Sequence, residues 1–303
     1  MAGPITRGLV PRLLQPGLHN IFGSQYQEYQ QEWRQIFDQL TSSQAFEIDV
    51  LISPTGMAVK KEEGDGVTYD SMKQEYEVIY THMTYALGFI ISEEAQEDNL
   101  YEKFSLMYAA ALGRSGRITK ETVLTNILNR GFDAAYPGGD GVALFSASHP
   151  ILGSLRSNIP AVGIDFSELA LETAAIDIGG FVNPRGQIIA QRPVKVIIPR
   201  QLEFTAKRIF DSILRVNTAN NDINALKALN TYSQGYVVNH FLSSSKAWFI
   251  KTDAPQGFQM FQRREPTFAV DNDFDTGNGK HKFTERFSGG MTDWHGGYAC
   301  PGA

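Results

Sequence analysis

The apolar positions near the N-terminus change from no period to a helical one. Residues 1–23 are rich in Gly, Pro and Arg and predict an extended arm. Residues 24–40 predict a helix, because Ser24 and Gln27 form a capping-box pattern and one face is apolar. That apolar stripe consists of Tyr26, Tyr29, Trp33, Ile36, Phe37 and Leu40. So strong a stripe predicts that the helix packs against another surface.

Residues 46–91 alternate between apolar and polar positions, which is the period of a strand. A charged turn, Lys60 to Gly66, divides the alternation, so we predict one long two-stranded hairpin with arms of about 15–18 residues. An isolated two-stranded ribbon is marginally stable in water. We therefore expect a partner surface to cover the apolar residues near the tip, which are Met57, Val59, Val67, Tyr69 and Met72.

The rest of the chain predicts helices and strands in mixed order. Residues 93–130 predict a long helix with Ser92 as N-cap and Gly131 as its end. Gly113, Ser115 and Gly116 mark a place where this helix could bend or split. Residues 136–163 are rich in turns. Further helices are expected over 167–178, 201–214 and 220–229, and strands over 194–199, over 236–242 and from 248 onward. The class is α+β, without a regular βαβ alternation.

Composition narrows the range of functions. The chain has 303 residues, 42% of them hydrophobic and 20% charged, which predicts a folded protein with a sizeable core. No apolar run approaches the ~20 residues that cross a bilayer, and the first residues predict no secretion signal. The net charge of −6 argues against broad contact with nucleic-acid phosphates. With Cys300 as its single cysteine, the chain forms no internal disulfide.

One cluster raises the alternative of a hydrolase. Ser146, Ser148 and His149 lie close together in the sequence, as a nucleophile and its base would. No Gly-x-Ser-x-Gly elbow surrounds them, and His149 is followed by a proline. A loop in which the histidine packs or caps is the better interpretation, and the Ser/His hydrolase stays an alternative.

A second cluster raises the alternative of a calcium-binding module. Asp271, Asp273 and Asp275 have the spacing of a calcium loop. The sixth position is Thr276 rather than Gly, and the twelfth is Lys282 rather than Glu. A polar turn between strands is the better interpretation. The histidines also lack zinc-enzyme spacing, and no nucleotide-binding glycine loop is present.

Several stretches, in this order along the chain, carry a resemblance to a known family. They are Leu144–Pro150, Val194–Pro199 with the helix expected from Gln201, Val237–Leu242 leading to Ala247–Ile250, and Asp271–Asn278 followed by Lys282, Arg286, Gly290 and Asp293–Gly296. Their order and spacing resemble the major capsid proteins of tailed double-stranded-DNA bacteriophages. The shared fold of that family is the Hong Kong 97-like fold, and the nearest branch is the Mu-like major head subunits.

The resemblance implies a domain organisation. Residues 1–45 correspond to the N-terminal arm and first helix, and residues 46–92 to the extended E-loop hairpin. Residues 93–162 correspond to the peripheral domain with its spine helix, and 163–245 to the axial domain. Residues 246–303 correspond to strands that return to the peripheral domain.

The resemblance also implies a function without catalysis, cofactor or metal. The implied protein is a structural major capsid protein, which assembles in the host cytoplasm as hexamers and pentamers of itself and forms the icosahedral head shell of the virion. It encloses double-stranded DNA without sequence-specific binding and contacts no membrane. The implied partners are a separate scaffolding protein, a portal at one vertex and, as an open option, a decoration protein. The predicted intersubunit contacts are Arg7, Arg12, Tyr26, Trp33, Met57, Lys60, Lys61, Glu62, Glu63, Asp65, Val67, Tyr69 and Met72.

Overall fold

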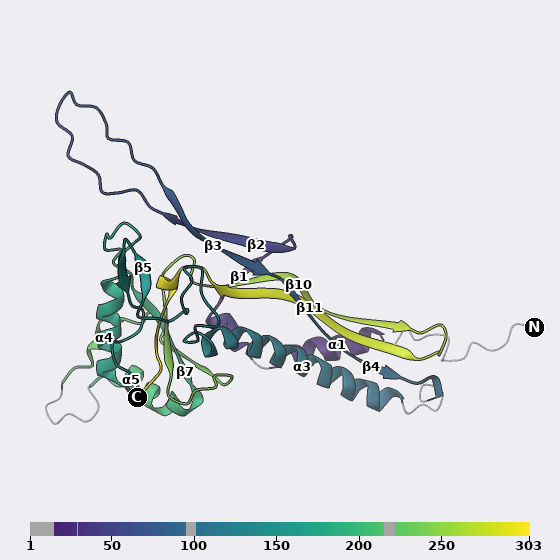
Figure 1. The fold of residues 1–303 in the computed structure, drawn as a ribbon. Coiled ribbons are helices and arrows are strands. Elements are labelled where there is room, and N and C mark those ends of the chain that lie inside the picture. Colours follow the sequence, from purple (N-terminus) through teal and green to yellow (C-terminus); the bar gives the residue numbers. More distant parts are fainter. Residues whose placement is uncertain (1–14, 29, 95–100, 215–221) are drawn as a thin grey trace, which may run out of the picture.

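The molecule consists of a compact lobe, a long extended part and a projecting ribbon (Figure 1). The computed structural model describes residues 15–28, 30–94, 101–214 and 222–303. The ribbon is formed by β2 (Phe46–Ser53) and β3 (Lys73–Thr81) and stands out from the region where the other two parts meet. The C-terminus lies in the lobe.

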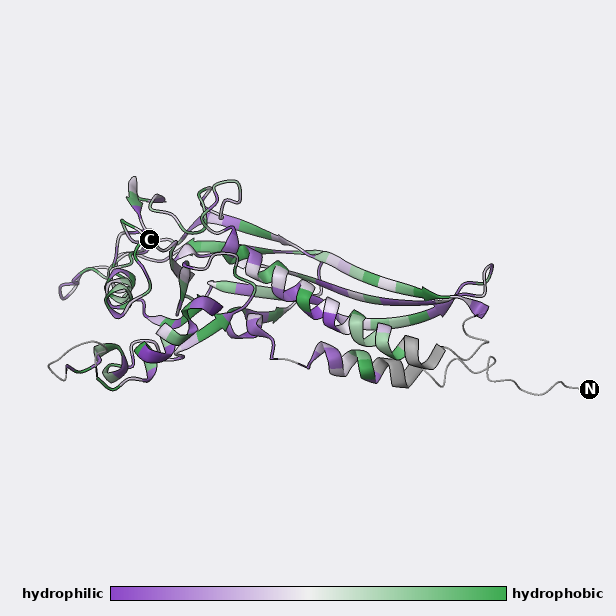
Figure 2. Ribbon diagram, turned by 90° about the horizontal axis from the view of Figure 1, so that it is seen from below, coloured by the Kyte–Doolittle hydropathy of each residue, from purple (hydrophilic) through white to green (hydrophobic). Residues whose placement is uncertain are grey.

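A four-stranded sheet forms the extended part. Its strands, in spatial order, are β1 (Asp38–Thr41), β10 (Phe258–Asn272), β11 (Gly279–Met291) and β4 (Met83–Ile91). β10 and β11 form one long hairpin that pairs from Phe258 with Met291 to Asn272 with Gly279. Two helices, α1 (Gln15–Tyr26) and α3 (Tyr101–Asn129), lie side by side along this sheet (Figure 2). The sheet is therefore covered by helices on one face.

The compact lobe contains a second four-stranded sheet. Its strands, in spatial order, are β12 (Gly297–Cys300), β9 (Trp248–Thr252), β7 (Pro193–Pro199) and β8 (Tyr236–Asn239). Helical segments of the lobe are α4 (Glu168–Gly179), η4 (Arg200–Leu202), α5 (Glu203–Asp211) and α6 (Ala225–Ala228). The turn-rich segment before α4 contains a short hairpin of β5 (His149–Ile151) and β6 (Ser154–Arg156), and a single turn, η5 (Trp294–Gly296), precedes β12.

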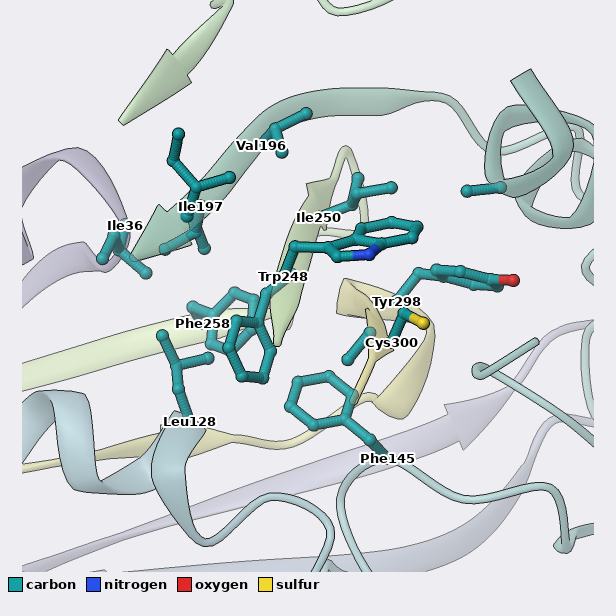
Figure 3. Close-up of a cluster of buried hydrophobic side chains, with 14 of the residues drawn as sticks. Ile36, Leu128, Phe145, Val196, Ile197, Trp248, Ile250, Phe258, Tyr298 and Cys300 are labelled. Carbon is teal, nitrogen blue, oxygen red and sulfur yellow. The ribbon is translucent and has the colours of Figure 1, made fainter. Parts of the chain in front are cut away.

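The main hydrophobic core lies where the lobe meets the extended part. Leu128 at the end of α3 and Phe258 at the start of β10 pack into one cluster with Trp248 and Ile250 of β9 (Figure 3). A second, smaller cluster lies between the two helices and the long hairpin. Its buried members are Phe22, Tyr26, Ala109, Leu112, Phe268 and Phe283. Two cores separated along the extended part give the molecule its elongated form.

The helix predicted over 24–40 is wrong. α1 ends at Tyr26, a single 3-10 turn, η3, covers Glu32–Gln35, and β1 follows. Ser24 lies inside α1, where its hydroxyl donates to the carbonyl of Ile21, so it is no N-cap. The apolar stripe is divided between the two cores, because Tyr26 lies in the smaller one and Trp33, Ile36 and Phe37 lie in the main one. Tyr29 of the stripe lies outside the described residues.

The single hairpin predicted over 46–91 is only partly right. β2 pairs with β3, but the alternating run is divided at His82, and β4 pairs with β11 instead. The side chains of β4 give the reason: Tyr85 stacks on Phe287 of β11, and Phe89 stacks on Tyr108 of α3. Residues 54–72, which join the two strands of the ribbon, form neither helix nor strand.

The long helix neither bends into two nor splits at its glycines, since α3 is continuous from Tyr101 to Asn129. A Cβ at Gly113 would lie 2.7 Å from the carbonyl oxygen of Phe22, and one at Gly116 would lie 2.7 Å from the ring of Phe283. Both distances are shorter than any ordinary contact. The glycines therefore allow α1 and the sheet to approach α3 closely.

The elements predicted in the lobe are largely confirmed. Ser167 caps α4 by accepting the N–H of Ala170, and Gly180 follows its end. Strands β7, β8 and β9 lie where the sequence predicts them. The helix expected over 201–214 is shorter and ends at Asp211. Of the helix expected over 220–229, residues 220–221 lie outside the described part, and the described helix is one turn capped by Asn224.

A buried ion pair joins the elements of the extended part. The Lys120 ammonium on α3 contacts Glu285 Oε1 on β11 and Gln262 Oε1 on β10, each at 2.6 Å. Tyr26 at the end of α1 donates to the other oxygen of Glu285 at 3.0 Å. Lys120 also lies 4.5 Å from the ring centroid of Trp33. Burial lowers the pKa of Lys120, and the carboxylate of Glu285 opposes that shift.

Removing one partner of this pair is expected to be more harmful than removing both. Lys120→Met alone leaves Glu285 buried without its cation and should lower the free energy of unfolding by about 3–5 kcal/mol. The double variant Lys120→Met/Glu285→Leu should recover most of that loss, because no uncompensated charge remains. Urea unfolding followed by tryptophan fluorescence and circular dichroism measures both. A double variant as unstable as the sum of the two single variants would contradict this account.

Candidate functional site

The tip of the ribbon exposes apolar side chains to solvent. Met57 is 81% exposed and Tyr69 is 92% exposed, and Val59, Val67 and Met72 are also exposed. The charged residues of the tip, Lys60, Lys61, Glu62, Glu63 and Asp65, are exposed among them. Lys60 pairs with Glu62 at 2.6 Å. A cluster of this size and character is typical of a surface that contacts another protein.

The outer face of the paired strands is also apolar. Ile48 and Ile79 lie opposite each other in the register of β2 and β3, and both are about half exposed. Phe46 and Ile52 extend this face along β2. The outer face is therefore apolar mainly along β2, while the exposed Glu77 and Thr81 of β3 lie opposite Val50 and Phe46.

The inner face of the ribbon is held by hydrogen bonds centred on Thr292. Tyr80 donates to the Thr292 hydroxyl at 2.6 Å, and that hydroxyl donates to Asp49 Oδ2 at 2.8 Å. Tyr76 donates to the Thr292 carbonyl at 3.1 Å. Gln256 donates to the other oxygen of Asp49 at 2.6 Å. Because the bonded groups come from both ribbon strands, this contact fixes the middle of the ribbon.

A second contact, between the ribbon and the lobe, lies nearer the tip. Arg185 Nη1 lies 3.1 Å from Asp70 Oδ2, and Arg185 Nη2 donates to the Ser71 carbonyl at 2.6 Å. Asp70 also accepts the N–H of Gly56 at 2.7 Å and that of Ser71 at 2.8 Å. These N–H donors, with Arg185 adding to them, hold the pKa of Asp70 below its ordinary value. Asp70 thus connects the two arms of the tip to each other and to the lobe.

The inner face of β3 packs on the body beside a hollow. Tyr80 is buried with its ring centroid 5.0 Å from that of Phe261, and Tyr76 and Val78 lie against Gly139. A hollow of about 510 Å³ lies between β3 and α3, lined by Val78, Tyr80, Val123, Ile127 and Arg130 among others. The ribbon is therefore held both by polar contacts and by packing of its inner side chains.

The segment that leads into the main core, at Glu32 and Trp33, is held by the buried side chain of Glu121. Glu121 on α3 accepts the N–H of Glu32 at 2.8 Å and that of Trp33 at 3.1 Å. Glu32 in turn accepts from the His240 ring and backbone N–H, at 2.6 and 2.8 Å. Burial raises the pKa of Glu121 to about 7; nearby Glu32 adds to the shift, and the two N–H donors oppose it.

Two of the predicted contact residues lie inside this chain's own core. Tyr26 is buried against α3, and Trp33 is only 1% exposed. We therefore remove both from the predicted contact set, because neither reaches the surface. Arg7 and Arg12 lie outside the described residues. The remaining predicted contacts all lie on the ribbon tip.

The geometry around His149 contradicts the hydrolase alternative. His149 Nδ1 lies 2.5 Å from Asp140 Oδ2, and Nε2 lies 3.0 Å from Asn158 Oδ1. The ring is buried and stacks on Trp294 with centroids 4.4 Å apart. Ser146 and Ser148 bond to each other at 2.9 Å. Both imidazole nitrogens have partners other than a serine, so this histidine is a packed structural residue.

The aspartates of the calcium-like motif lie at the end of β10 (Asp271) and in the turn to β11 (Asp273 and Asp275). Asp273 accepts from Lys280 at 2.5 Å and from the N–H of Asp275 at 3.2 Å, and Asp271 accepts the N–H of Asn272. Among the described residues, no group of three or more His, Cys, Asp or Glu is arranged to hold a metal ion. The polar-turn interpretation agrees with this geometry.

The sequence did not point to the residues that hold the ribbon in place. Arg185 lies in an Asn-Pro-Arg-Gly turn, which predicts a loop but not its contact with Asp70, 115 residues earlier. Thr292 follows a strand and carries no motif. Within the described parts of the chain, no helix is long and apolar enough to cross a membrane.

Comparisons with known proteins agree with the resemblance to phage capsid proteins. A family model described as phage capsid protein matches residues 75–300. No curated protein matches the chain.

Three similar solved structures illustrate the fold. A virus-like particle from Pyrococcus furiosus has a TM-score of 0.52 and 10% identity, over 94% of this chain and 98% of that chain. A phage-related protein from Bordetella bronchiseptica RB50 has a TM-score of 0.51 and 13% identity, over 92% and 95%. The procapsid of bacteriophage JBD30 has a TM-score of 0.50 and 14% identity, over 97% and 75%. At these identities the likeness shows a shared fold.

Loss of the Arg185 contact is expected to loosen the ribbon tip. Arg185→Ala should make amide hydrogen exchange in residues 54–72 about two- to fivefold faster, the range of an exposed ion pair. Mass spectrometry of the exchanged peptides measures it. Arg192→Ala is the matched control, since the side chain of Arg192 is exposed on the same lobe. Equal exchange in both variants would mean that Arg185 does not restrain the tip.

Glu121 should make stability fall as pH rises. With a pKa of about 7 in the folded chain against 4.5 unfolded, Glu121 keeps its proton on folding between those values. The unfolded state binds fewer protons there, so the free energy of unfolding decreases from pH 4.5 to 7, by at most about 3 kcal/mol. Glu121→Gln should remove this component. Urea midpoints at pH 5 and 7.5 compare the two proteins, and parallel pH profiles would contradict the prediction.

Proposed function

This chain belongs to the phage capsid protein family and is a structural protein of the phage head shell, and we propose that its copies assemble as hexamers and pentamers that close around packaged double-stranded DNA. The fold is mixed helix and sheet of the Hong Kong 97-like kind, and the chain is not an enzyme. The observation that carries the statement is the family match over residues 75–300.

The ribbon is the surface that supports self-assembly most directly. In an isolated chain its tip leaves Met57, Val59, Val67, Tyr69 and Met72 in water, which is unfavourable by the area of apolar surface left uncovered. A neighbouring copy that covers this surface removes that cost. The mixed charges of the tip, Lys60 to Asp65, offer such a neighbour ion pairs of either sign. We therefore assign the tip as the main intersubunit contact.

The domain names implied by the sequence follow the order of the elements, although β4 lies in the long sheet and β9 and β12 lie in the lobe sheet. We assign the N-terminal arm and first helix to residues 1–45, the E-loop to 46–92 and the peripheral domain with its spine helix to 93–162. We assign the axial domain to 163–245 and the returning strands of the peripheral domain to 246–303. In support, the ribbon, the long helix α3, the compact lobe and the long hairpin follow one another in that order.

The finer identity rests on the sequence resemblance. We place the chain nearest the Mu-like major head subunits, in virions assembled in the host cytoplasm. A separate scaffolding protein, a portal at one vertex and, as an open option, a decoration protein are its proposed partners. Contact with DNA is proposed to be independent of sequence, which agrees with the acidic net charge of −6.

Charging the ribbon tip should prevent assembly without unfolding the subunit. We expect the wild-type chain, expressed with and without its candidate scaffolding partner, to form closed shells or rings of five and six. Met57→Asp/Tyr69→Asp should remain small, because a charge in a covered apolar contact is strongly unfavourable. Light scattering and negative-stain electron microscopy measure particle size, and circular dichroism checks that melting is unchanged.

Phe274→Asp is the matched control, since Phe274 is fully exposed at the other hairpin turn. We expect it to assemble like the wild type. If the tip variant also assembles normally, the tip is not the main contact, although the family assignment stands. A wild-type chain that stays a monomer under every condition would contradict self-assembly itself.

A further inference from the structure

The ribbon tip contains an Asp-Gly pair with open surroundings. Asp65 and Gly66 lie in the connection between β2 and β3, which forms neither helix nor strand. Asp65 is exposed, and a Cβ built on Gly66 would meet no atom within 4 Å. The N–H of Asp65 donates to the Glu62 carbonyl at 3.2 Å. Among the residues that the structure describes, neither the Asp65 carboxyl group nor the Gly66 N–H has a hydrogen-bond partner.

This pair has the groups for a reaction of the chain with itself. The Gly66 nitrogen can attack Cγ of the Asp65 side chain when that carboxyl is protonated. A C–N bond forms, one carboxyl oxygen leaves as water with the amide proton, and a five-membered succinimide ring results. Glycine favours this step, because it has no Cβ to hinder the nitrogen or to restrict the backbone rotation.

Hydrolysis of the ring completes the reaction. Water adds to either ring carbonyl, its hydroxyl goes to the carbon, and its proton goes to the Gly66 nitrogen. Addition at the side-chain carbonyl restores aspartate. Addition at the main-chain carbonyl breaks the original peptide bond and leaves Gly66 joined through Cγ of residue 65, which is isoaspartate. One water is lost and one is gained, so no other reagent is needed.

Two comparable pairs elsewhere in the chain are held in place. In the pair Asp140–Gly141, the carboxylate of Asp140 is fixed by His149 Nδ1 at 2.5 Å. In the pair Asn278–Gly279, the side-chain oxygen of Asn278 accepts the N–H of Glu93 at 3.2 Å, and the glycine is buried within β11. A side chain held by such a bond cannot turn toward the nitrogen of the next residue. These pairs are therefore internal references for the open one.

We propose that Asp65 and Gly66 form a self-modifying site, at which the free subunit slowly converts its ribbon tip from aspartate to isoaspartate through a succinimide. The product adds one carbon to the main chain of the tip and moves the carboxylate onto the α carbon. This change lies between the charged residues 60–63 and the exposed side chain of Val67. The reaction takes place within one chain, so it does not depend on which surface the tip contacts.

The test follows the chemistry of residue 65 over time. The full-length chain is kept dilute at neutral pH and 37 °C for several weeks, and light scattering checks that no particles form. Trypsin releases residues 62–73 as one peptide. We expect a second chromatographic form of this peptide with the same mass, which electron-transfer fragmentation identifies as isoaspartate at residue 65. In water enriched in oxygen-18 that form should carry one heavy oxygen. The peptides that contain Asp140 and Asn278 should stay unchanged.

Two variants and an unfolded sample make the result specific. Gly66→Ala should slow the reaction severalfold, because its Cβ hinders the nitrogen while the open surroundings accept the methyl group. Asp65→Glu keeps the charge and should stop the reaction, because its ring would need six members. In guanidinium chloride the wild-type chain should modify all three pairs. A folded chain without isoaspartate at residue 65 would overturn the proposal, and so would equal rates at Asp65 and Asp140 in the folded chain.

Discussion

The contact between Lys120 and Glu285 determines how the extended half of the subunit is arranged. A buried charge is tolerated only when its partner is in place, so α3 and β11 must meet at that point. Tyr26 and Gln262 complete the bonding of the carboxylate, which fixes the end of α1 and the middle of β10. The ring of Trp33 lies next to the ammonium, which also fixes the position of η3, the turn that contains Trp33. One polar contact thus sets the register of elements that apolar packing alone would leave free to slide.

The ribbon is built on the opposite principle. Its outer and tip apolar side chains face solvent, and its inner face is held by packing of Tyr80 on Phe261 and by hydrogen bonds to Thr292 and Arg185. Each of these bonds is worth little by itself and can be remade in another geometry. A shell subunit benefits from this division, because copies at different positions in a closed shell must meet at slightly different angles. The rigid half supplies a fixed frame, and the ribbon supplies the adjustment.

Local signals in the sequence predicted much of the fold. The capped helix α4, the buried strand β7 and the long helix α3 were predicted because their neighbours in sequence decide them. The helix expected over 24–40 failed because its apolar residues divide between two cores, which no local period reveals. β4 was assigned to the wrong partner because alternation does not say which strand is adjacent. The same limit hid Arg185 and Thr292, whose partners lie far along the chain.

The ribbon also acts as a mechanical lever. From His82 to Gly64 the chain runs for 18 residues, which at about 3.3 Å per residue reaches up to roughly 60 Å. A rotation of about 10° at the base would then carry the tip through an arc of roughly 10 Å, more than the spacing of two adjacent strands. A displacement too small to disturb the fold is thus magnified into one large enough to exchange one docking position for another. The range of angles allowed at the base of the ribbon, rather than the contact surfaces, therefore determines how much the orientation of neighbouring subunits can vary.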